Sequence, residues 1–189
     1  MKINKSLILS LLLMVLVSAL YRIMPNRPMG FAPQIAIGLF SGALFIKNKK
    51  WAFVLPLLSM FLSDLLYQFL YQQGFTQIQG FYDGQWINYA LFAGITCFGF
   101  LIGKKKIVTV LLAAIGAPTT YFLVSNFLVW VSDRGFGLNR PKTLAGLLMC
   151  YNDGLPFYTN SVIATVVFSA FLFGSYYLIS NFYSRKQLA

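Results

Sequence analysis

The sequence predicts an all-α membrane protein: one polytopic bundle of six transmembrane helices, formed by a single domain over residues 1–189. Composition is the first reason. Hydrophobic residues make up 58% of the chain and charged residues 10%, whereas a soluble domain needs about a quarter of its residues charged to cover its surface. The second reason is that six apolar stretches are long enough to approach the ~30 Å of a bilayer core at ~1.5 Å per residue.

Short polar segments separate these stretches, and lysines are concentrated in alternate segments. They gather at 47–50 and 104–106, on the same side of the predicted membrane as the charged residues near both termini. The positive-inside rule places that side in the cytoplasm, together with the N and C termini. We therefore expect a multi-pass protein of the cytoplasmic (inner) membrane, embedded in the lipid bilayer, with spans at Ser6–Arg22, Phe31–Ile46, Trp51–Gln72, Asn88–Gly103, Ile107–Val131 and Pro156–Tyr183.

The first stretch allows a second interpretation. Lys2 and Lys5 precede an apolar run that ends in Val17-Ser18-Ala19, which is also the pattern of a cleaved signal peptide. The run continues to Tyr21, however, and the charge pattern is satisfied when this helix is kept. A retained first transmembrane helix is therefore the expectation.

Composition also excludes several chemistries. The chain has no histidine, and its only acids are Asp64, Asp83, Asp133 and Asp153. Histidine-dependent catalysis and histidine-ligated metal sites are excluded, and an aspartyl protease would need a second embedded carboxylate beside Asp64. We expect no enzyme activity, cofactor or metal. The net charge of +11 does not indicate nucleic-acid binding, because membrane topology already explains the lysine clusters.

The longest connection between spans runs from Ser132 to Phe157 on the outer side. Its segment Thr143–Met149 is apolar enough for a short helix lying at the surface. Asn152-Asp153-Gly154 is a turn signature, and Pro156 suits the first turn of a helix, where its missing N–H does no harm. The sequence therefore predicts a separate surface helix before the last span.

Asp64 is the most unusual residue of the predicted spans. A charged carboxylate near the centre of a transmembrane helix costs about 2.5–3.5 kcal/mol on insertion scales, so Asp64 must face protein or water. Ser59, Ser63 and Tyr67 share its side of the helix at helical spacing. A structural salt bridge to Arg22 or Arg27 and direct contact with a ligand are both consistent with this pattern.

Other polar residues lie on the same, outer side and suggest a pocket for a small solute. Arginines suit an anionic or carbonyl group, asparagine and tyrosine can orient the solute, and tryptophan can cover its apolar part. Each of these residues can equally bond within the protein. The predicted lining of the pocket is Arg22, Asn26, Arg27, Asp64, Asn126, Trp130, Tyr151, Asn152 and Asn160.

Gly38 and Gly42 place two small residues on one face of the second predicted span. This spacing lets two helices approach closely. Packing inside the bundle and docking of a partner helix are both consistent with it.

Several sequence blocks resemble a family of bacterial six-span membrane proteins that is assigned only to transport. They are Arg22-Ile23-Met24-Pro25, Ile37-Gly38-Leu39-Phe40-Ser41-Gly42-Ala43, Ser63-Asp64-Leu65, Ser125-Asn126-Phe127-Leu128-Val129-Trp130 and Thr143-Leu144-Ala145-Gly146-Leu147-Leu148-Met149-Cys150-Tyr151. That family is similar to the S-components of energy-coupling-factor (ECF) transporters, which are the membrane subunits that capture the substrate.

The resemblance implies that this chain captures a small solute in a pocket open to the outer face. It also implies a partner, a coupling membrane subunit with ATPases, which S-components dock through an Ala-xxx-Ala pair on the first helix; here Ser6 and Ser10 have that spacing. The chain has no Gly-xxxx-Gly-Lys-Ser/Thr signature, so ATP hydrolysis would belong to another chain. The alternative is a structural or assembly protein that acts through helix–helix contacts.

Overall fold

The computed structural model describes residues 5–103, 106–132 and 140–186, with side chains from 10 to 182 within these ranges. This part of the chain forms six helices and no strand, which confirms the all-α class. The helices are α1 (Lys5–Arg22), α2 (Gln34–Leu44), α3 (Lys49–Gln72), α4 (Gln85–Leu101), α5 (Ile107–Ser132) and α6 (Leu144–Lys186).

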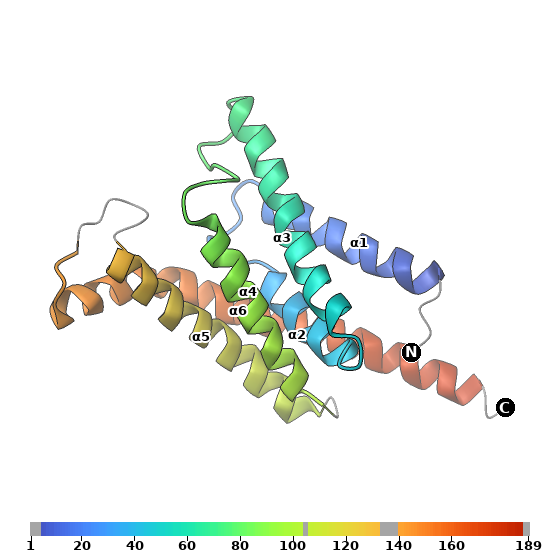
Figure 1. The fold of residues 1–189 in the computed structure, drawn as a ribbon. Helices are drawn as coiled ribbons and strands as arrows, with labels where there is room; N and C mark the ends of the chain where they lie inside the picture. Colours follow the sequence, from blue (N-terminus) through green and yellow to red (C-terminus); the bar gives the residue numbers. More distant parts are fainter. Residues whose placement is uncertain (1–4, 104–105, 133–139, 187–189) are drawn as a thin grey trace.

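Consecutive helices run in opposite directions (Figure 1). The start of α1, the α2–α3 turn, the end of α4 and the end of α6 lie at the lower right of that view. We call this the lysine end, after Lys47, Lys49, Lys50 and Lys106. The other end, at the upper left, carries Asp64, Asp83 and Asp153 and is called the aspartate end. Sorting charges by segment therefore separates them correctly between the two ends of the bundle.

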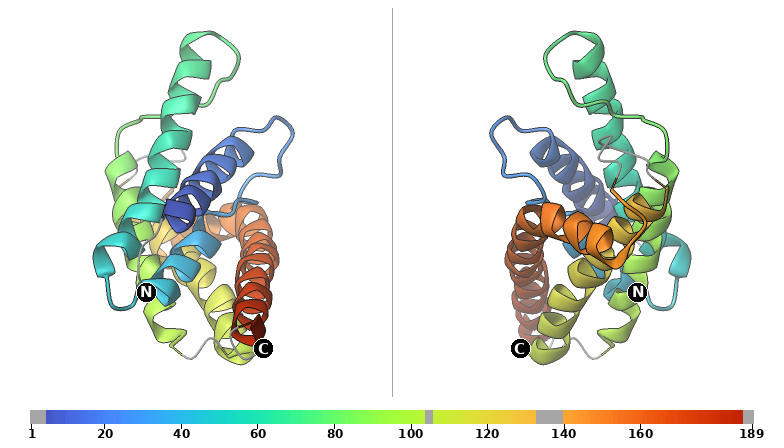
Figure 2. Two further views of the ribbon diagram at one scale, coloured as in Figure 1. Left: turned by 90° about the vertical axis from the view of Figure 1, so that its right-hand side faces the viewer. Right: turned by 90° about the vertical axis from the view of Figure 1, so that its left-hand side faces the viewer.

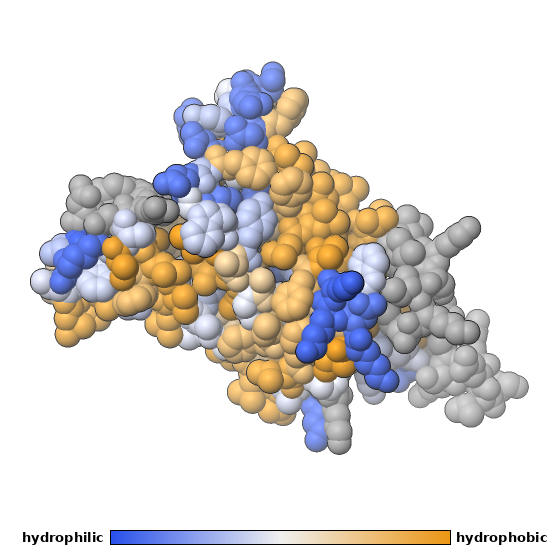
Figure 3. All heavy atoms as spheres, viewed as in Figure 1, coloured by the Kyte–Doolittle hydropathy of each residue, from blue (hydrophilic) through white to orange (hydrophobic). Residues whose placement is uncertain are grey.

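Three helices are long and apolar enough to cross a membrane: α3, α5 and the part of α6 from Leu144 to Phe182. Helices α2 and α4 are shorter, and of α1 only the part from Ser10 to Arg22 has described side chains. Figure 3 shows hydrophobic residues over much of the surface, with hydrophilic ones gathered toward the ends. These features indicate a membrane protein, but the expectation of six helices of full membrane-crossing length is wrong.

The largest difference from the expected spans is α2. Its 11 residues cover only about 16 Å at 1.5 Å per residue. The expected span Phe31–Ile46 is shortened because Pro33 occupies the N-cap position and the chain leaves the helix at Phe45. All residues from Gln34 to Ala43 are buried, so α2 is the central helix of the bundle, packed against α3, α4 and α6.

The separate surface helix before the last span is also not observed. Residues Leu144–Lys186 form one continuous helix of 43 residues, which begins where Thr143 Oγ1 accepts a hydrogen bond from the N–H of Gly146 at 3.2 Å. The expected turn at 152–154 lies inside this helix, where the Asp153 carboxylate forms an ion pair with Arg140. Pro156 lies inside the helix, and Figure 2 shows that α6 bends after its orange N-terminal part, as expected near a proline.

Gly38 and Gly42 bring α2 against α4. A Cβ atom on Gly42 would lie 2.8 Å from the Cα of Gly99, and one on Gly38 would lie 3.2 Å from Thr96 Oγ1. Only glycine permits this approach of the two backbones. This face is therefore covered by the chain's own α4, and close packing inside the bundle accounts for it without a partner helix.

Pro56 interrupts the hydrogen bonds of α3 in the middle of the bundle. It has no N–H to donate to the carbonyl four residues earlier, which belongs to Ala52. The hydroxyl of Ser41 in α2 donates to that carbonyl at 2.8 Å instead. Ser41 and Ala52 are both fully buried, so this bond satisfies a group that water cannot reach.

We predict that Ser41→Ala lowers the free energy of unfolding by about 1–3 kcal/mol, because it leaves the Ala52 carbonyl buried without a donor. In a Pro56→Ala background the loss should be smaller, because residue 56 then supplies the missing N–H. Thermal unfolding of the four proteins in detergent measures both effects. An equal loss in the two backgrounds would contradict this account.

Candidate functional site

Asp64 lies at the junction of α1, α3 and α4, and its side chain is 1% exposed. One carboxylate oxygen, Oδ1, forms an ion pair with the Arg22 guanidinium at the end of α1. The same guanidinium nitrogen donates to the hydroxyl of Ser63 at 2.5 Å. Of the two partners expected from the sequence, Arg22 is therefore the one that pairs with Asp64.

The other carboxylate oxygen of Asp64 is held by the first turn of α4. Oδ2 accepts hydrogen bonds from Gln85 Nε2 at 2.5 Å and from the Tyr89 hydroxyl at 2.7 Å. Because residues 85 and 89 are four apart, both side chains lie on the same face of α4. The carboxylate thus accepts from three side chains of two helices, which is the pairing that a buried charge requires.

Hydrogen bonds continue from Gln85 toward the surface. Asn88 Nδ2 donates to Gln85 Oε1 at 3.1 Å and to the Tyr82 hydroxyl at 2.5 Å. Asn88 Oδ1 accepts from the Tyr121 hydroxyl of α5 at 3.1 Å. We call this set the Asp64 network; its members are Arg22, Ser63, Asp64, Tyr82, Gln85, Asn88, Tyr89 and Tyr121.

The network becomes more exposed along its length, from Asp64 at 1% to Tyr82 at 48%. Tyr82 lies in the α3–α4 connection, outside the helices. Desolvation raises the pKa of its phenol above the ordinary value of 10. Its hydroxyl is therefore protonated at neutral pH and is available as a neutral donor and acceptor at the surface of the network.

The α3–α4 connection is held close to Asp64. A Cβ atom on Gly80 would lie 2.6 Å from the backbone nitrogen of Gln68 and would overlap the Asp64 carbonyl. The N–H of Phe81 donates to Gln68 Oε1 at 3.2 Å. This contact, which only glycine allows, places the chain so that Tyr82 and Gln85 reach the network.

Arg27 does not extend from the α1–α2 turn toward a ligand. Its guanidinium donates to the carbonyls of Arg22 at 3.0 Å and Phe31 at 2.8 Å. The Arg22 carbonyl also accepts from the Tyr67 hydroxyl at 2.7 Å. Arg27 therefore satisfies the C-terminal end of α1 and closes the turn, in which the exposed Asn26 adopts φ +61°.

Asn160 attaches the same turn to α6. Its Nδ2 donates to the carbonyl of Met29 at 2.9 Å, and a side chain on Gly30 would collide with the backbone of Phe157. Asn26, Arg27 and Asn160 thus belong to the contact between the α1–α2 turn and α6, outside the Asp64 network.

Three further predicted residues join α5 to α6 or to the segment just before it, and a fourth does not. Asn126 bonds the Phe122 carbonyl of its own helix at 2.8 Å and lies against Gly154. Tyr151 donates to the Leu123 carbonyl at 3.1 Å, and Trp130 Nε1 donates to the Pro141 carbonyl at 2.9 Å. The fourth residue, Asn152, is exposed.

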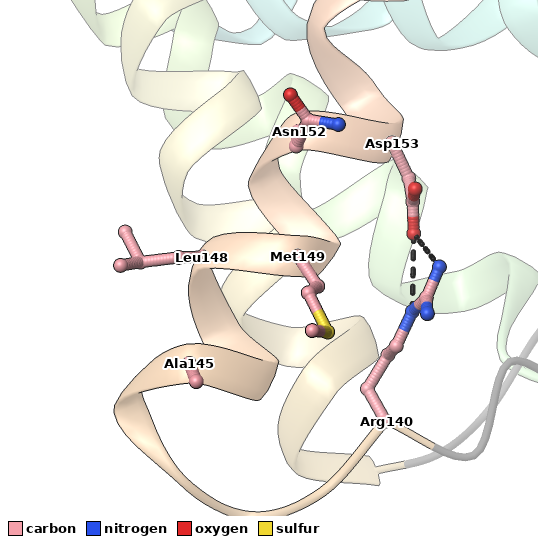
Figure 4. A pocket seen from close by; sticks show the side chains of 6 residues that line it. All are labelled: Arg140, Ala145, Leu148, Met149, Asn152 and Asp153. Atoms are coloured by element: carbon pink, nitrogen blue, oxygen red, sulfur yellow. Dashed lines mark hydrogen bonds and ion pairs between the residues drawn. The ribbon is translucent and has the colours of Figure 1, made fainter.

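Asn152 lines an open hollow of about 570 Å³ at the start of α6 (Figure 4). Figure 4 shows Arg140 and Asp153 facing each other across one side of it, where Arg140 Nη2 lies 2.5 Å from Asp153 Oδ2. Apolar side chains form the other side. The full lining is Arg140, Ala145, Leu148, Met149, Asn152 and Asp153.

The predicted pocket residues therefore fall into three groups, and only Arg22 and Asp64 share a site. Ser6 and Ser10, the pair expected to dock a coupling subunit, are not placed together by the structure. Ser10 is exposed, and the side chain of Ser6 lies outside the described residues. Among the described residues, no group of three or more acidic or cysteine side chains is placed to hold a metal ion.

Five members of the network were not predicted: Tyr82, Gln85, Asn88, Tyr89 and Tyr121. The polar residues at 85, 88 and 89 do have a recognisable spacing, because positions i, i+3 and i+4 share one face of a helix. They open an apolar helix at the end of the bundle that carries Asp64, and this combination is the signal that could have identified them.

Comparison with known proteins places the whole chain in one family. Residues 2–187 match the family described as "Family of unknown function (DUF6580)". The chain belongs to DUF6580. No curated protein and no solved structure matches the chain.

The match to DUF6580 extends over nearly the whole sequence. The family description names no transporter, so transport and the likeness to S-components are not carried by it. What the DUF6580 chain does must be argued from the Asp64 network and its surroundings.

We predict that Arg22→Met destabilises the protein by about 3–5 kcal/mol, because it leaves the Asp64 carboxylate buried without its cation. The double variant Arg22→Met, Asp64→Asn should recover part of this loss, since neither charge is then unpaired. Thermal unfolding in detergent is the measurement. If the loss of stability in the double variant equals the sum of the losses in Arg22→Met and Asp64→Asn measured alone, the pairing is refuted.

Tyr89→Phe should cost about 1.5–3 kcal/mol by removing one donor to the carboxylate. The same unfolding measurement tests this value.

Proposed function

We propose that this protein is a multi-pass protein of the cytoplasmic membrane that captures a small solute at its aspartate end for transport. In this proposal all six helices cross the bilayer or enter it from one side, and both termini are cytoplasmic. The lysine end then faces the cytoplasm, as the positive-inside rule requires, and the aspartate end faces outward.

The observation that carries the proposal is the extent of the Asp64 network. An ion pair between Arg22 and Asp64 would suffice to clamp α1 to α3. The hydrogen bonds continue through Gln85 and Asn88 to Tyr82 and Tyr121. Tyr82 is half-exposed, so the network reaches the surface. Polar side chains within a membrane bundle are costly and are typical of substrate sites.

The chemistry at the exposed end of the network indicates the kind of solute. The Tyr82 hydroxyl, which accepts from Asn88, can still donate, and Asn88 Oδ1 and the Tyr121 hydroxyl can still accept. All three groups are neutral, and the two tyrosine rings offer apolar faces. Phe92 extends this aromatic surface, since its ring centroid lies 5.3 Å from that of Tyr121. Arg22 is already paired with Asp64. An uncharged solute with hydrogen-bonding groups therefore suits this end better than the anion expected from the sequence.

The partner expected from the S-component resemblance is part of the proposal. With no nucleotide-binding signature in the chain, an energised cycle needs a coupling membrane subunit with ATPases. The proposed role is capture of the solute rather than catalysis, and the proposed partners are the solute, the bilayer and this coupling subunit.

A structural or assembly role is the second candidate, and a specific observation favours it. Asp64, Arg27 and Asn160 all bond within the chain. In this alternative the Asp64 network clamps four helices and binds nothing else.

We predict that the protein, purified in mild detergent from the cells that make it, carries a small molecule detectable by mass spectrometry. Asn88→Ala should reduce its recovery by about tenfold or more, because one lost hydrogen bond to a solute is worth about that factor. Asn152→Ala is the matched control, since it removes an asparagine at the same end but outside the network, and should retain the molecule.

The same samples separate the two candidates. Copurification of a coupling membrane subunit with two ATPases supports solute capture by an S-component-like chain. Absence of any small molecule, together with a large loss of stability in Asn88→Ala, would refute solute capture and support the clamp.

A further inference from the structure

Two buried oxygen atoms near the Asp64 network make no hydrogen bond to any described residue: the side-chain carbonyl Oε1 of Gln34 and the hydroxyl Oγ of Ser59. Gln34 is 2% exposed and Ser59 is fully buried. Buried polar atoms in proteins are nearly always paired with protein or with ordered water. These two atoms therefore require a partner that the described residues do not supply.

The packing of α2 against α3 places the two residues opposite each other. The helices are antiparallel, with Ser41 meeting Ala52 through a hydrogen bond and Gly38 meeting the side chain of Pro56. Moving one further turn toward the aspartate end along both helices brings Gln34 to the level of Ser59. Gln34 is seven residues before Ser41, so both lie on the face of α2 that meets α3.

Helix α1 reaches the same level from the other side. It runs parallel to α3, and Arg22 bonds Ser63, so one turn earlier Ser18 lies at the level of Ser59. Gln34 Nε2 donates to the Ser18 carbonyl at 3.3 Å. Ser18, Gln34 and Ser59 thus lie at one level of α1, α2 and α3, about one turn below the Arg22–Asp64 pair. We call this the Ser59 junction.

Ser59 differs from the serines around it. Ser18 donates to the carbonyl of Met14 at 2.5 Å, and Ser63 donates to that of Met60 at 2.7 Å, each within its own helix. Such a bond to the preceding turn is the usual way for a helical serine to satisfy itself. Ser59 makes none, so its hydroxyl is left for a partner in the junction.

We infer that the Ser59 junction is a binding site for one ordered water molecule, which bridges α2 and α3 beside α1. The water donates one hydrogen bond to Gln34 Oε1 and accepts one from the Ser59 hydroxyl. Two such bonds meet the minimum that a buried water requires. A cation is the less suitable guest, because the Arg22 guanidinium lies one turn away and the charge of Asp64 is already balanced by it.

A double-mutant cycle on the full-length protein in detergent tests this site through the midpoint of thermal unfolding. Ser59→Ala should lower the midpoint by roughly 2–6 °C, because the water loses a partner and leaves Gln34 poorly satisfied. In a Gln34→Met background, which has no carbonyl for the water to bridge, Ser59→Ala should have little further effect. Ser41→Ala is the matched control: it also removes a buried hydroxyl between α2 and α3, but its effect should be the same in both backgrounds.

Three results would overturn the proposal. A Ser59→Ala protein with an unfolding midpoint at or above that of the unsubstituted protein would mean that the Ser59 hydroxyl has no partner or bonds its own helix. This comparison does not need the Gln34→Met variant to fold. Equal losses in both backgrounds would show that no guest couples the two residues. A higher midpoint in sodium or potassium chloride than in choline chloride at equal ionic strength, lost in Ser59→Ala, would identify the guest as a cation.

Discussion

The ion pair between Arg22 and Asp64 is the interaction on which the arrangement of the helices depends. Asp64 is buried in an apolar bundle, so its charge is tolerated only because Arg22, Gln85 and Tyr89 all bond it. These partners come from the ends of α1 and α4. Pairing one carboxylate thus attaches the end of α1 and the start of α4 to α3.

Interruptions of regular structure are compensated by neighbouring helices in the same way. Pro56 removes a hydrogen bond from α3, and Ser41 of α2 replaces it. The end of α1 leaves the Arg22 carbonyl free, and Tyr67 and Arg27 bond it. The small residues of α2 let α4 approach until the backbones touch. The packing of the helices therefore depends on hydrogen bonds and close contacts at a few positions.

Much of this fold could be predicted from the sequence, because apolar stretches, lysine clusters and prolines are local signals. The all-α class, the separation of charge between the two ends and Arg22 as one of the two partners considered for Asp64 are observed. The short α2 and the continuous α6 could not be predicted, since both depend on tertiary contacts. Residues 152–154 lie inside α6, although their sequence context indicates a turn. The candidate site was only partly predicted for the same reason: polar spacing shows which residues share a helix face, but not which face meets another.

The order in which the network's members occur along the chain has a consequence for how the protein enters a membrane. Arg22 leaves the ribosome first, and Asp64 follows 42 residues later. Gln85 and Tyr89 come after a further 21 and 25 residues. In the proposed membrane orientation, Arg22 lacks its anion until Asp64 follows, and the Asp64 carboxylate then lacks two of its three donors until α4 follows. The network is complete only when the start of α4 has joined α1 and α3, so a chain that ends before residue 85 leaves the buried Asp64 carboxylate with Arg22 as its one partner of these three.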